Sequence, residues 1–282
     1  MRGCTPRIIA FGGENLAKTK RKTIITAGRL VYGVCYTAPL PRDEGQQRAA
    51  KLKASTAARQ KLNLKHSWQK LEVVIAANFS YRDLVLTLTY DDDHLPPSMR
   101  EAVRTLKKFL TQLRTERQKY GGDLRYIYVT ESRHGDGRIH HHVIINGTGN
   151  DYELIRSLWV SGSAIDIDTI DVRGYSELAQ YLTKEARELG SPNGARTWVP
   201  GKGLIHPKAE SEWVDDNMTL AAPPGAIILD SDQATMNAFG SYTYIKYLLP
   251  EPRPQRARPK YQKKKKDAFL SDLEQGISFN KS

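Results

Sequence analysis

Between residues 124 and 146 the chain reads LRYIYVTESRHGDGRIHHHVIIN. Its first part, 124–131, is rich in β-branched and aromatic residues, and its last part, 138–146, ends in a continuous apolar run. Both compositions are typical of β-strands, and the stretch 132–137 between them has the glycines of a hairpin turn. The sequence therefore predicts two adjacent antiparallel strands, the second of which carries three consecutive histidines.

The histidine triplet is a candidate metal site. Successive side chains of a strand point to opposite faces, so His140 and His142 project together, roughly 7 Å apart along the strand, while His141 points the other way. Two imidazoles so placed can chelate one metal ion. The alternative is a polar patch on an edge strand, but the residues after the triplet are too apolar for a solvated loop. Glu131 ends the neighbouring strand, where it either leans toward the histidine pair or is an ordinary carboxylate beside the turn.

A tyrosine and a lysine form the second candidate site. Residues 175–186 contain no Gly or Pro, and their apolar positions recur at helical spacing, which predicts a helix. Tyr181 and Lys184 are three residues apart and share a face of that helix. A phenol is a poor nucleophile until a nearby base or cation stabilises the phenolate, and Lys184 can supply that charge. Taken alone, the pair also fits a packing tyrosine beside a solvated lysine.

Together with a third segment, DLVLTLTYDDD at residues 83–93, these motifs resemble the HUH endonuclease superfamily. Within it, the chain is similar to the single-tyrosine rolling-circle replication initiators (Rep proteins) of bacterial mobile elements and phages. The similarity covers roughly residues 67–190, with weaker likeness at 194–198 and 240–247. The residue between the two ligand histidines is usually hydrophobic in that superfamily, whereas here it is His141. Relaxases, another branch, do not fit, because the three histidines are contiguous and the best tyrosine lies downstream of them.

The resemblance implies a mechanism. His140, His142 and Glu131 would hold a divalent ion, Mg²⁺ or Mn²⁺, although such a ligand set would also accept Zn²⁺. Tyr181 would attack a phosphodiester of the origin, giving a 5′-phosphotyrosyl link and a free 3′-hydroxyl, and Lys184 would offset charge in the transition state. Reversal by a new 3′-hydroxyl would rejoin the strand. Single-stranded or melted origin DNA would be the substrate, and a host helicase and polymerase would be partners, because the chain contains no Gly-x-x-x-x-Gly-Lys-Ser/Thr motif of its own.

The charge distribution agrees with a nucleic-acid substrate. The net charge is +12, but residues 1–66 hold 14 basic and 3 acidic residues and residues 252–267 hold 8 and 1. The remainder is mildly acidic, so attraction to phosphates is expected mostly from the two ends. No long apolar run, no leading signal pattern and only two cysteines are present, which predicts a cytoplasmic protein with no membrane segment.

The expected fold class is α+β, with a central antiparallel sheet, helices mainly on one face, and N- and C-terminal extensions; the resemblance adds an HUH/RRM-like palm. Further helices are expected within 47–61, 97–120, 151–160 and 268–273, and further strands at 30–36, 83–90 and 164–172. The expected segments are a basic, partly flexible arm at 1–66, the endonuclease domain at 67–190, an extension packed on it at 191–250, and a basic, disordered tail at 251–282.

Three other functions use some of the same residues. A single-tyrosine transposase would share the chemistry, although its catalytic domain resembles a shorter chain. A non-catalytic nucleic-acid-binding protein would use Tyr126 and Tyr128 of the predicted sheet as stacking platforms. A metal hydrolase would use bound water as nucleophile and need His140 but not Tyr181. Tyr175 is a second candidate nucleophile, but it faces elsewhere on the helix.

Overall fold

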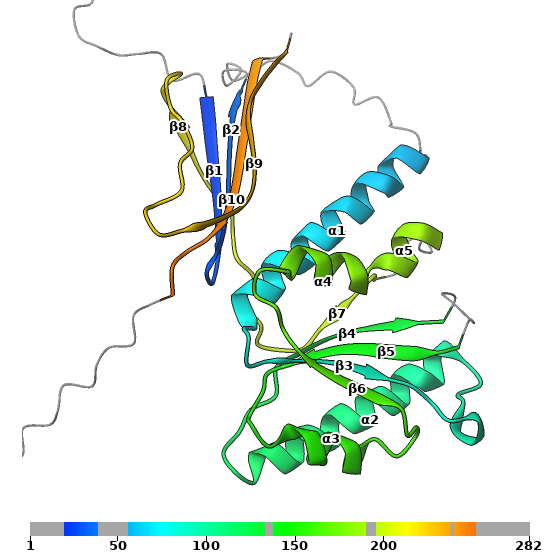
Figure 1. Ribbon diagram of the computed structural model, residues 1–282. Helices are drawn as coiled ribbons and strands as arrows, with labels where there is room; N and C mark the ends of the chain where they lie inside the picture. Colours follow the sequence, from blue (N-terminus) through cyan, green and yellow to red (C-terminus); the bar gives the residue numbers. More distant parts are fainter. Residues whose placement is uncertain (1–19, 39–55, 133–137, 190–195, 238–239, 252–282) are drawn as a thin grey trace, which may run out of the picture. The chain divides into compact units, whose positions relative to one another are not determined.

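The computed structural model describes residues 20–38, 56–132, 138–189, 196–237 and 240–251. These residues form five α-helices, one short 3-10 helix and two five-stranded antiparallel sheets, here called sheet A and sheet B (Figure 1). The predicted α+β class and central antiparallel sheet are confirmed. The helix expected at 268–273 lies outside the described residues.

Sheet B holds the predicted hairpin and has the strand order β6-β3-β5-β4-β7. Its strands are β3 (Leu84–Leu88), β4 (Tyr126–Glu131), β5 (His140–Ile145), β6 (Ile165–Thr169) and β7 (Val199–Pro200). All neighbouring strands of this sheet are antiparallel, and β5 lies at its centre between β3 and β4. The histidine strand is therefore an inner strand, not the edge strand of the alternative interpretation.

Helices cover both faces of sheet B (Figure 1). The helices are α1 (Thr56–Asn78), α2 (Met99–Gln118), α3 (Asp151–Leu158), α4 (Tyr175–Leu182) and α5 (Lys184–Leu189), and the 3-10 helix is Asp92–His94. One face packs on α2 and α3, whose apolar stripes surround Leu86, Val143 and Ile145. The other face packs on α1 and α4 around Ile127 and Ile144. The prediction placed helices mainly on one face, whereas α1, predicted only over 47–61, continues to Asn78 and buries Leu71, Val74 and Ile75 against this second face. None of the described helices is both long and apolar enough to span a bilayer.

The helix predicted at 175–186 is interrupted. Helix α4 ends at Leu182 and α5 begins at Lys184, with Thr183 between them at φ −111° and ψ 11°. The Thr183 hydroxyl donates to the carbonyl of Ala179 at 2.9 Å, and such bonds to the preceding turn favour bending or ending a helix. The prediction that Tyr181 and Lys184 share one continuous helix is therefore wrong.

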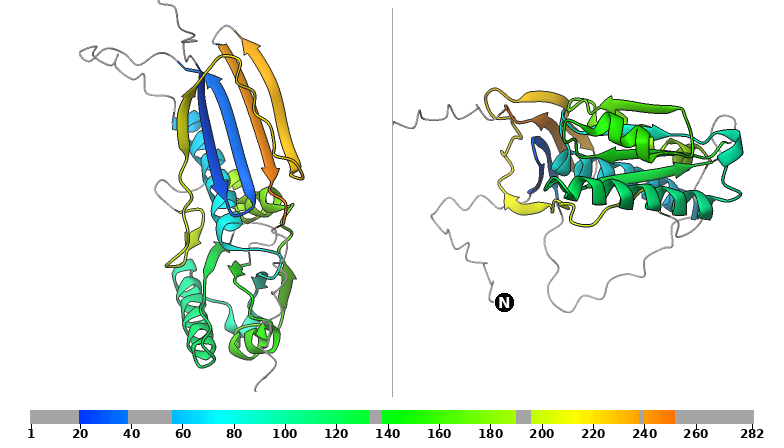
Figure 2. Two further views of the ribbon diagram at one scale, coloured as in Figure 1. Left: turned by 90° about the vertical axis from the view of Figure 1, so that its left-hand side faces the viewer. Right: turned by 90° about the horizontal axis from the view of Figure 1, so that it is seen from below.

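Sheet A combines strands from both ends of the described chain and has the order β8-β1-β2-β10-β9 (Figure 2). Its strands are β1 (Lys20–Ala27), β2 (Leu30–Thr37), β8 (Glu210–Val214), β9 (Ile227–Asn237) and β10 (Gly240–Leu248). The predicted strand at 30–36 is thus confirmed as β2. Strands of the predicted arm pair directly with strands of the predicted C-terminal extension; the segment boundaries themselves stay predictions.

Sheet A contacts α1 through a tight turn and a buried charge pair. Gly28, in the β1–β2 turn, has φ +58°, and a Cβ on it would lie 2.5 Å from the carbonyl oxygen of Ala76, so glycine is required there. Glu72 of α1 is completely buried, accepts a hydrogen bond from the Tyr32 hydroxyl, and pairs with Lys246 Nζ at 2.5 Å. The strands β2 and β10 are thereby attached to α1.

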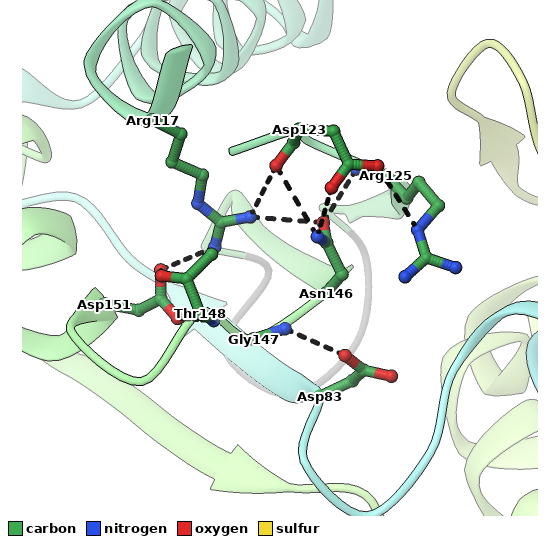
Figure 3. Close-up of polar contacts among 8 residues, drawn as sticks. All are labelled: Asp83, Arg117, Asp123, Arg125, Asn146, Gly147, Thr148 and Asp151. Carbon is green, nitrogen blue, oxygen red and sulfur yellow. Dashed lines mark hydrogen bonds and ion pairs between the residues drawn. The ribbon is translucent and has the colours of Figure 1, made fainter. Parts of the chain in front are cut away.

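A buried polar cluster closes one end of sheet B (Figure 3). Arg117 of α2 pairs with Asp151 at 2.7 Å between the nearest side-chain atoms, and it also donates to the Asn146 side-chain oxygen at 3.1 Å. Asp151 in turn accepts bonds from the backbone and hydroxyl of Thr148. These bonds connect α2, the chain after β5 and the start of α3. Because Asn146 follows the last residue of β5, this cluster lies at the strand end remote from His140.

Candidate metal centre and tyrosine site

The hairpin of β4 and β5 brings a carboxylate and two imidazoles together. Glu131 is the direct cross-strand partner of His140, and Val129 is that of His142, so the three polar side chains lie on one face. One ligand atom from each of Glu131, His140 and His142 lies within 4.8 Å of the others. Glu131 and His142 are buried at 0% and 1% exposure, and His140 is half-buried.

Both imidazoles present the same nitrogen to the carboxylate. The Nε2 atoms of His140 and His142 lie 3.2 and 3.5 Å from Glu131 Oε2. The other nitrogen of each ring has a separate partner: His140 Nδ1 lies 2.9 Å from the carbonyl oxygen of Arg138, and His142 Nδ1 lies 3.3 Å from the Thr87 hydroxyl. A proton held on Nδ1 by such a partner leaves Nε2 as the free lone pair, which is the usual arrangement of a metal-binding histidine.

His141 points into the opposite face and is a core residue. It is fully buried, with Nε2 at 2.7 Å from the Tyr90 hydroxyl and Nδ1 at 2.8 Å from the Thr130 hydroxyl. Burial lowers the pKa of its imidazole to about 3, so the ring is neutral at physiological pH. With both nitrogens bonded inside the protein, His141 is not available to a ligand.

The electrostatics of the cluster favour a carboxylate anion. Burial by itself would raise the pKa of Glu131, but the imidazoles of His140 and His142 beside it and the charge of Lys184 outweigh it and hold this pKa at about 2. The Glu131 carboxylate in turn raises the pKa of His140, because it can accept a hydrogen bond from the protonated ring. An ionised carboxylate and two imidazoles are a donor set that divalent metals accept.

Two of the atoms that a metal ion would bind lack hydrogen-bond partners. Glu131 Oε1 and His142 Nε2 are buried side-chain atoms with no hydrogen bond in the described structure. Burying such atoms without a partner costs free energy, which a metal ion at this point would offset. The residues therefore fit a divalent ion. Asp166 and Asp168 on β6 are exposed, and neither belongs to the group of candidate ligands.

Tyr181 and Lys184 lie beside this cluster although the helix between them is broken. The Tyr181 ring packs edge-on against His142, with centroids 4.9 Å apart, and its side chain is 45% exposed. Lys184 Nζ lies 4.1 Å from the centre of the Tyr181 ring and 3.5 Å from Glu131 Oε2. A phenol that is open to solvent therefore lies next to a cation and to the three candidate ligands.

The other tyrosines singled out from the sequence have structural environments. Tyr175 is 4% exposed, and its hydroxyl donates to the carbonyl of Phe79 at 2.8 Å; burial raises its pKa to about 12. Tyr128 is 5% exposed and packs among the core side chains beneath α2. A buried ring cannot stack on a base, so the paired platform of Tyr126 and Tyr128 is not formed.

Residues 83–187 match a family model described as replication-associated protein, of the ORF2 type. This segment is similar to that family of replication-associated proteins. The predicted resemblance to rolling-circle replication initiators is thereby confirmed, and the candidate ligands, Tyr181 and Lys184 all fall within the matched residues. No curated protein and no solved structure matches the chain significantly.

Two residues of the matched segment support the site without having been predicted to do so. Thr87 belongs to the Leu-Thr-Leu-Thr motif, and pairing of β3 with β5 places it directly opposite His142. Glu185 accepts a hydrogen bond from the backbone of Ser132 at 2.8 Å, which ties α5 to the end of β4 just after Glu131. The motif made Thr87 visible in the sequence, but only the strand register shows what it contacts. No sequence pattern indicated Glu185.

Proposed function

We propose that the protein is a rolling-circle replication initiator that nicks and rejoins one DNA strand at an origin through Tyr181. The observation that carries the proposal is the exposed Tyr181 ring lying against both His142 and Lys184, beside a carboxylate and two imidazoles whose lone pairs converge. A nucleophile, a cation and a metal-ligand set within one site are the groups that phosphodiester transesterification needs.

His140, His142 and Glu131 would hold the divalent ion, Mg²⁺ or Mn²⁺. Bound there, the ion would act as a Lewis acid that neutralises the oxygens of the scissile phosphate. Glu131 keeps its negative charge at neutral pH because its pKa is held at about 2. Thr87 and the carbonyl of Arg138 orient the two imidazoles through their Nδ1 atoms.

Tyr181 supplies the nucleophilic oxygen. As its phenolic oxygen bonds to phosphorus, the bond from phosphorus to the sugar O3′ breaks; the phenol loses its proton and O3′ gains one. The products are a 5′-phosphotyrosyl link and a free 3′-hydroxyl that can prime synthesis. Lys184 offsets the negative charge that develops on the phenolic oxygen and the phosphate. The energy of the broken bond is kept in the tyrosyl ester, so attack by a new 3′-hydroxyl rejoins the strand without ATP.

Single-stranded or melted origin DNA is the proposed substrate, and a host helicase and polymerase would act on the 3′-hydroxyl. The proposal is supported by the family match and by the excess of basic residues in 1–66 and 252–267. A plasmid, a phage or an integrative element would each require this same reaction.

The test is the formation of a covalent protein–DNA adduct. Purified protein is incubated with labelled single-stranded DNA of candidate origins and Mn²⁺, and the products are separated on a denaturing gel. We expect the wild type to give a product in which the protein is linked to the 5′ end of the downstream DNA fragment, and Tyr181→Phe to give none. Tyr175→Phe is the matched control, because it removes a hydroxyl six residues away that lies in the core, and it should still form the adduct.

The outcomes separate the competing functions. Cleavage without an adduct, unchanged in Tyr181→Phe but lost in His140→Ala, would identify a metal hydrolase and overturn the proposal. Binding without cleavage at all origins and metals tried would identify a binding protein. An adduct formed by Tyr181→Phe but lost in Tyr175→Phe would assign the nucleophile to Tyr175.

A further inference from the structure

Sheet A carries a row of aromatic side chains to which the proposed nicking reaction assigns no role. Trp213 on β8 pairs with Arg21 on β1, Arg21 pairs with Tyr36 on β2, and Tyr36 pairs with Tyr242 on β10. Directly paired residues of neighbouring antiparallel strands point to the same face. These four residues, here called the aromatic row, therefore cross four adjacent strands on one face of sheet A.

The aromatic row lies at the open end of its face. At the other end of the same face, Ala27, Leu30 and Leu248 are at most 1% exposed and belong to the core shared with α1. In the row, Tyr242 is 43% exposed, Arg21 is exposed, and Trp213 and Tyr36 are half-buried. The core that sheet A shares with α1 lies at the opposite ends of these strands, so the aromatic side chains of the row are not needed to form it.

On the reverse face of sheet A, the apolar side chains beside the aromatic row are buried. Cys35 and Ile245, which alternate with Tyr36 and Tyr244, are 3% and 7% exposed. Leu220 packs over this face, since its Cδ2 lies 3.5 Å from where a Cβ on Gly33 would be. Among the described residues, the aromatic rings at this end of the strands thus lie on the face that bears the row.

The charges near the aromatic row favour a polyanion. The Arg21 guanidinium lies 5.9 Å from the centre of the Trp213 ring, close enough for a cation–π contact. Asp232 and Asp230 on β9 are the strand-register partners of Tyr244 and Lys246, toward the α1 end of the sheet, and the Asp230 carboxylate accepts a hydrogen bond from the Tyr244 hydroxyl. Residues 1–66, which include β1 and β2, hold 14 basic and 3 acidic residues.

We propose that the aromatic row is a stacking platform for single-stranded DNA, separate from the tyrosine site on sheet B. Bases of a single strand offer both ring faces, and they stack on exposed aromatic side chains while arginine neutralises the phosphates. Four strands at about 4.8 Å spacing span roughly 14 Å, enough for about two or three bases. This inference rests on the proposed function in one respect: the proposed function identifies the bound nucleic acid as DNA.

The test measures binding in the absence of cleavage. A fluorescein-labelled oligothymidylate of about 20 nucleotides is titrated with the full chain in EDTA, and fluorescence anisotropy gives Kd. We expect Tyr36→Ala and Tyr242→Ala each to raise Kd about 10-fold, and Tyr36→Phe and Tyr242→Phe, which keep the ring, to change it less than about twofold. Tyr152→Ala is the matched control, because Tyr152 is 51% exposed on α3, outside sheet A.

Adduct formation by the same variants keeps this inference distinct from the proposed nicking reaction. Tyr181→Phe should bind the oligothymidylate as tightly as the wild type, even though it forms no adduct. Failure of the wild type to form any adduct, with the ring-dependent binding intact, would overturn the nicking reaction and leave the platform supported.

Three results would overturn the platform. The first is a Kd that is equal in the wild type and in both alanine variants, and the second is a phenylalanine variant that loses as much affinity as its alanine counterpart. The third is a wild-type dimer that Tyr242→Ala converts to a monomer without change in DNA affinity, which would identify the row as a protein interface. A melting transition measured by circular dichroism confirms that each variant is folded before its Kd is compared.

Discussion

The two ends of sheet B both hold buried charged residues, but they are built differently. At the end with Arg117, the guanidinium and the Asp151 carboxylate are 2.7 Å apart and are also bonded to Asn146 and Thr148. At the end with Glu131, the nearest atoms of the surrounding cations and imidazoles lie at 3.2–3.5 Å. Two metal-ligand atoms there, Glu131 Oε1 and His142 Nε2, have no hydrogen bond, whereas the buried atoms without one at the other end, Arg117 Nε and Arg125 Nε, carry protons and cannot bind a metal ion. A close ion pair with further bonds on each partner indicates a structural role, whereas convergent lone pairs without partners indicate a ligand site.

This difference separates stability from chemistry along a single strand. Strand β5 begins at the candidate ligands His140 and His142 and is followed by Asn146 of the structural cluster. Substitutions at one end are therefore expected to change the free energy of unfolding, and substitutions at the other end to change metal affinity. Each expectation below fails if a change at one end produces the effect assigned to the other.

The largest effect is expected from Arg117→Ala. The substitution leaves the Asp151 carboxylate buried without its cation, which costs about 3–5 kcal/mol of unfolding free energy. Urea denaturation followed by circular dichroism measures it. Arg104→Ala is the matched control, because Arg104 lies on the same helix and pairs with Glu101 at an exposed position, where a pair contributes about 0.3–0.5 kcal/mol. A loss below about 1 kcal/mol for Arg117→Ala would contradict the structural role.

The next effect is a loss of metal affinity in His142→Ala. Removing one of three candidate ligands should weaken Mn²⁺ binding by more than about 100-fold, beyond the effect of losing a residue that only orients a ligand. Isothermal titration calorimetry measures it. His206→Ala, at an exposed histidine outside the cluster, should bind as the wild type does. Unchanged Mn²⁺ affinity in His142→Ala would show that His142 is not a ligand.

How far the sequence could predict these two ends depends on the range of the interactions. The hairpin, the β5 alternation and the stripe of α2 are local patterns, and the structure confirms each of them. The break at Thr183 was missed because threonine is only mildly unfavourable in a helix, so nothing nearby marks it. Sheet A was missed as a unit because its strands come from residues 20–37 and 210–248, and pairing over such separation has no local pattern.

The candidate site shows the same limit. Strand alternation separated His140 and His142 from His141, and the structure places His141 in the core accordingly. The role of Thr87 depends on which residue of β5 it faces, and that register is fixed only when the sheet assembles. The proximity of Lys184 to Glu131 likewise depends on how α5 docks after the break, so it could not be derived from spacing.

A third prediction concerns pH and tests whether His141 is a buried, neutral residue that contributes to stability and does not bind metal. Its pKa is about 3 in the folded protein because of burial, against about 6.5 when unfolded. Below pH 6.5 the unfolded chain takes up a proton that the folded chain does not, so this contribution is full above pH 6.5 and is lost as the pH falls toward 3. At pH 5 the loss is about 2 kcal/mol.

The measurement compares urea denaturation at pH 8 and pH 5 for the wild type and His141→Gln. The variant keeps a hydrogen-bonding side chain but cannot titrate, so the difference between the two pH values should be about 2 kcal/mol smaller in it. Other titrating groups, including His140, whose raised pKa acts in the opposite direction, are common to both proteins and cancel. Identical pH dependence in the two proteins would mean that His141 is not a buried neutral residue.

The smallest effect is expected from Thr87→Val, which removes one hydroxyl beside the ligand set. The hydroxyl faces His142 Nδ1 at 3.3 Å, and losing such an orienting partner should weaken Mn²⁺ binding about 10-fold while costing no more than about 1 kcal/mol of stability. Thr89→Val is the matched control, since its hydroxyl donates to the Ala164 carbonyl at 2.7 Å and contacts no candidate ligand. Equal Mn²⁺ affinity in both variants would mean that packing alone orients the His142 ring. Metal binding at the Glu131 end of sheet B would then not need the hydrogen bond from Thr87 that the geometry indicates.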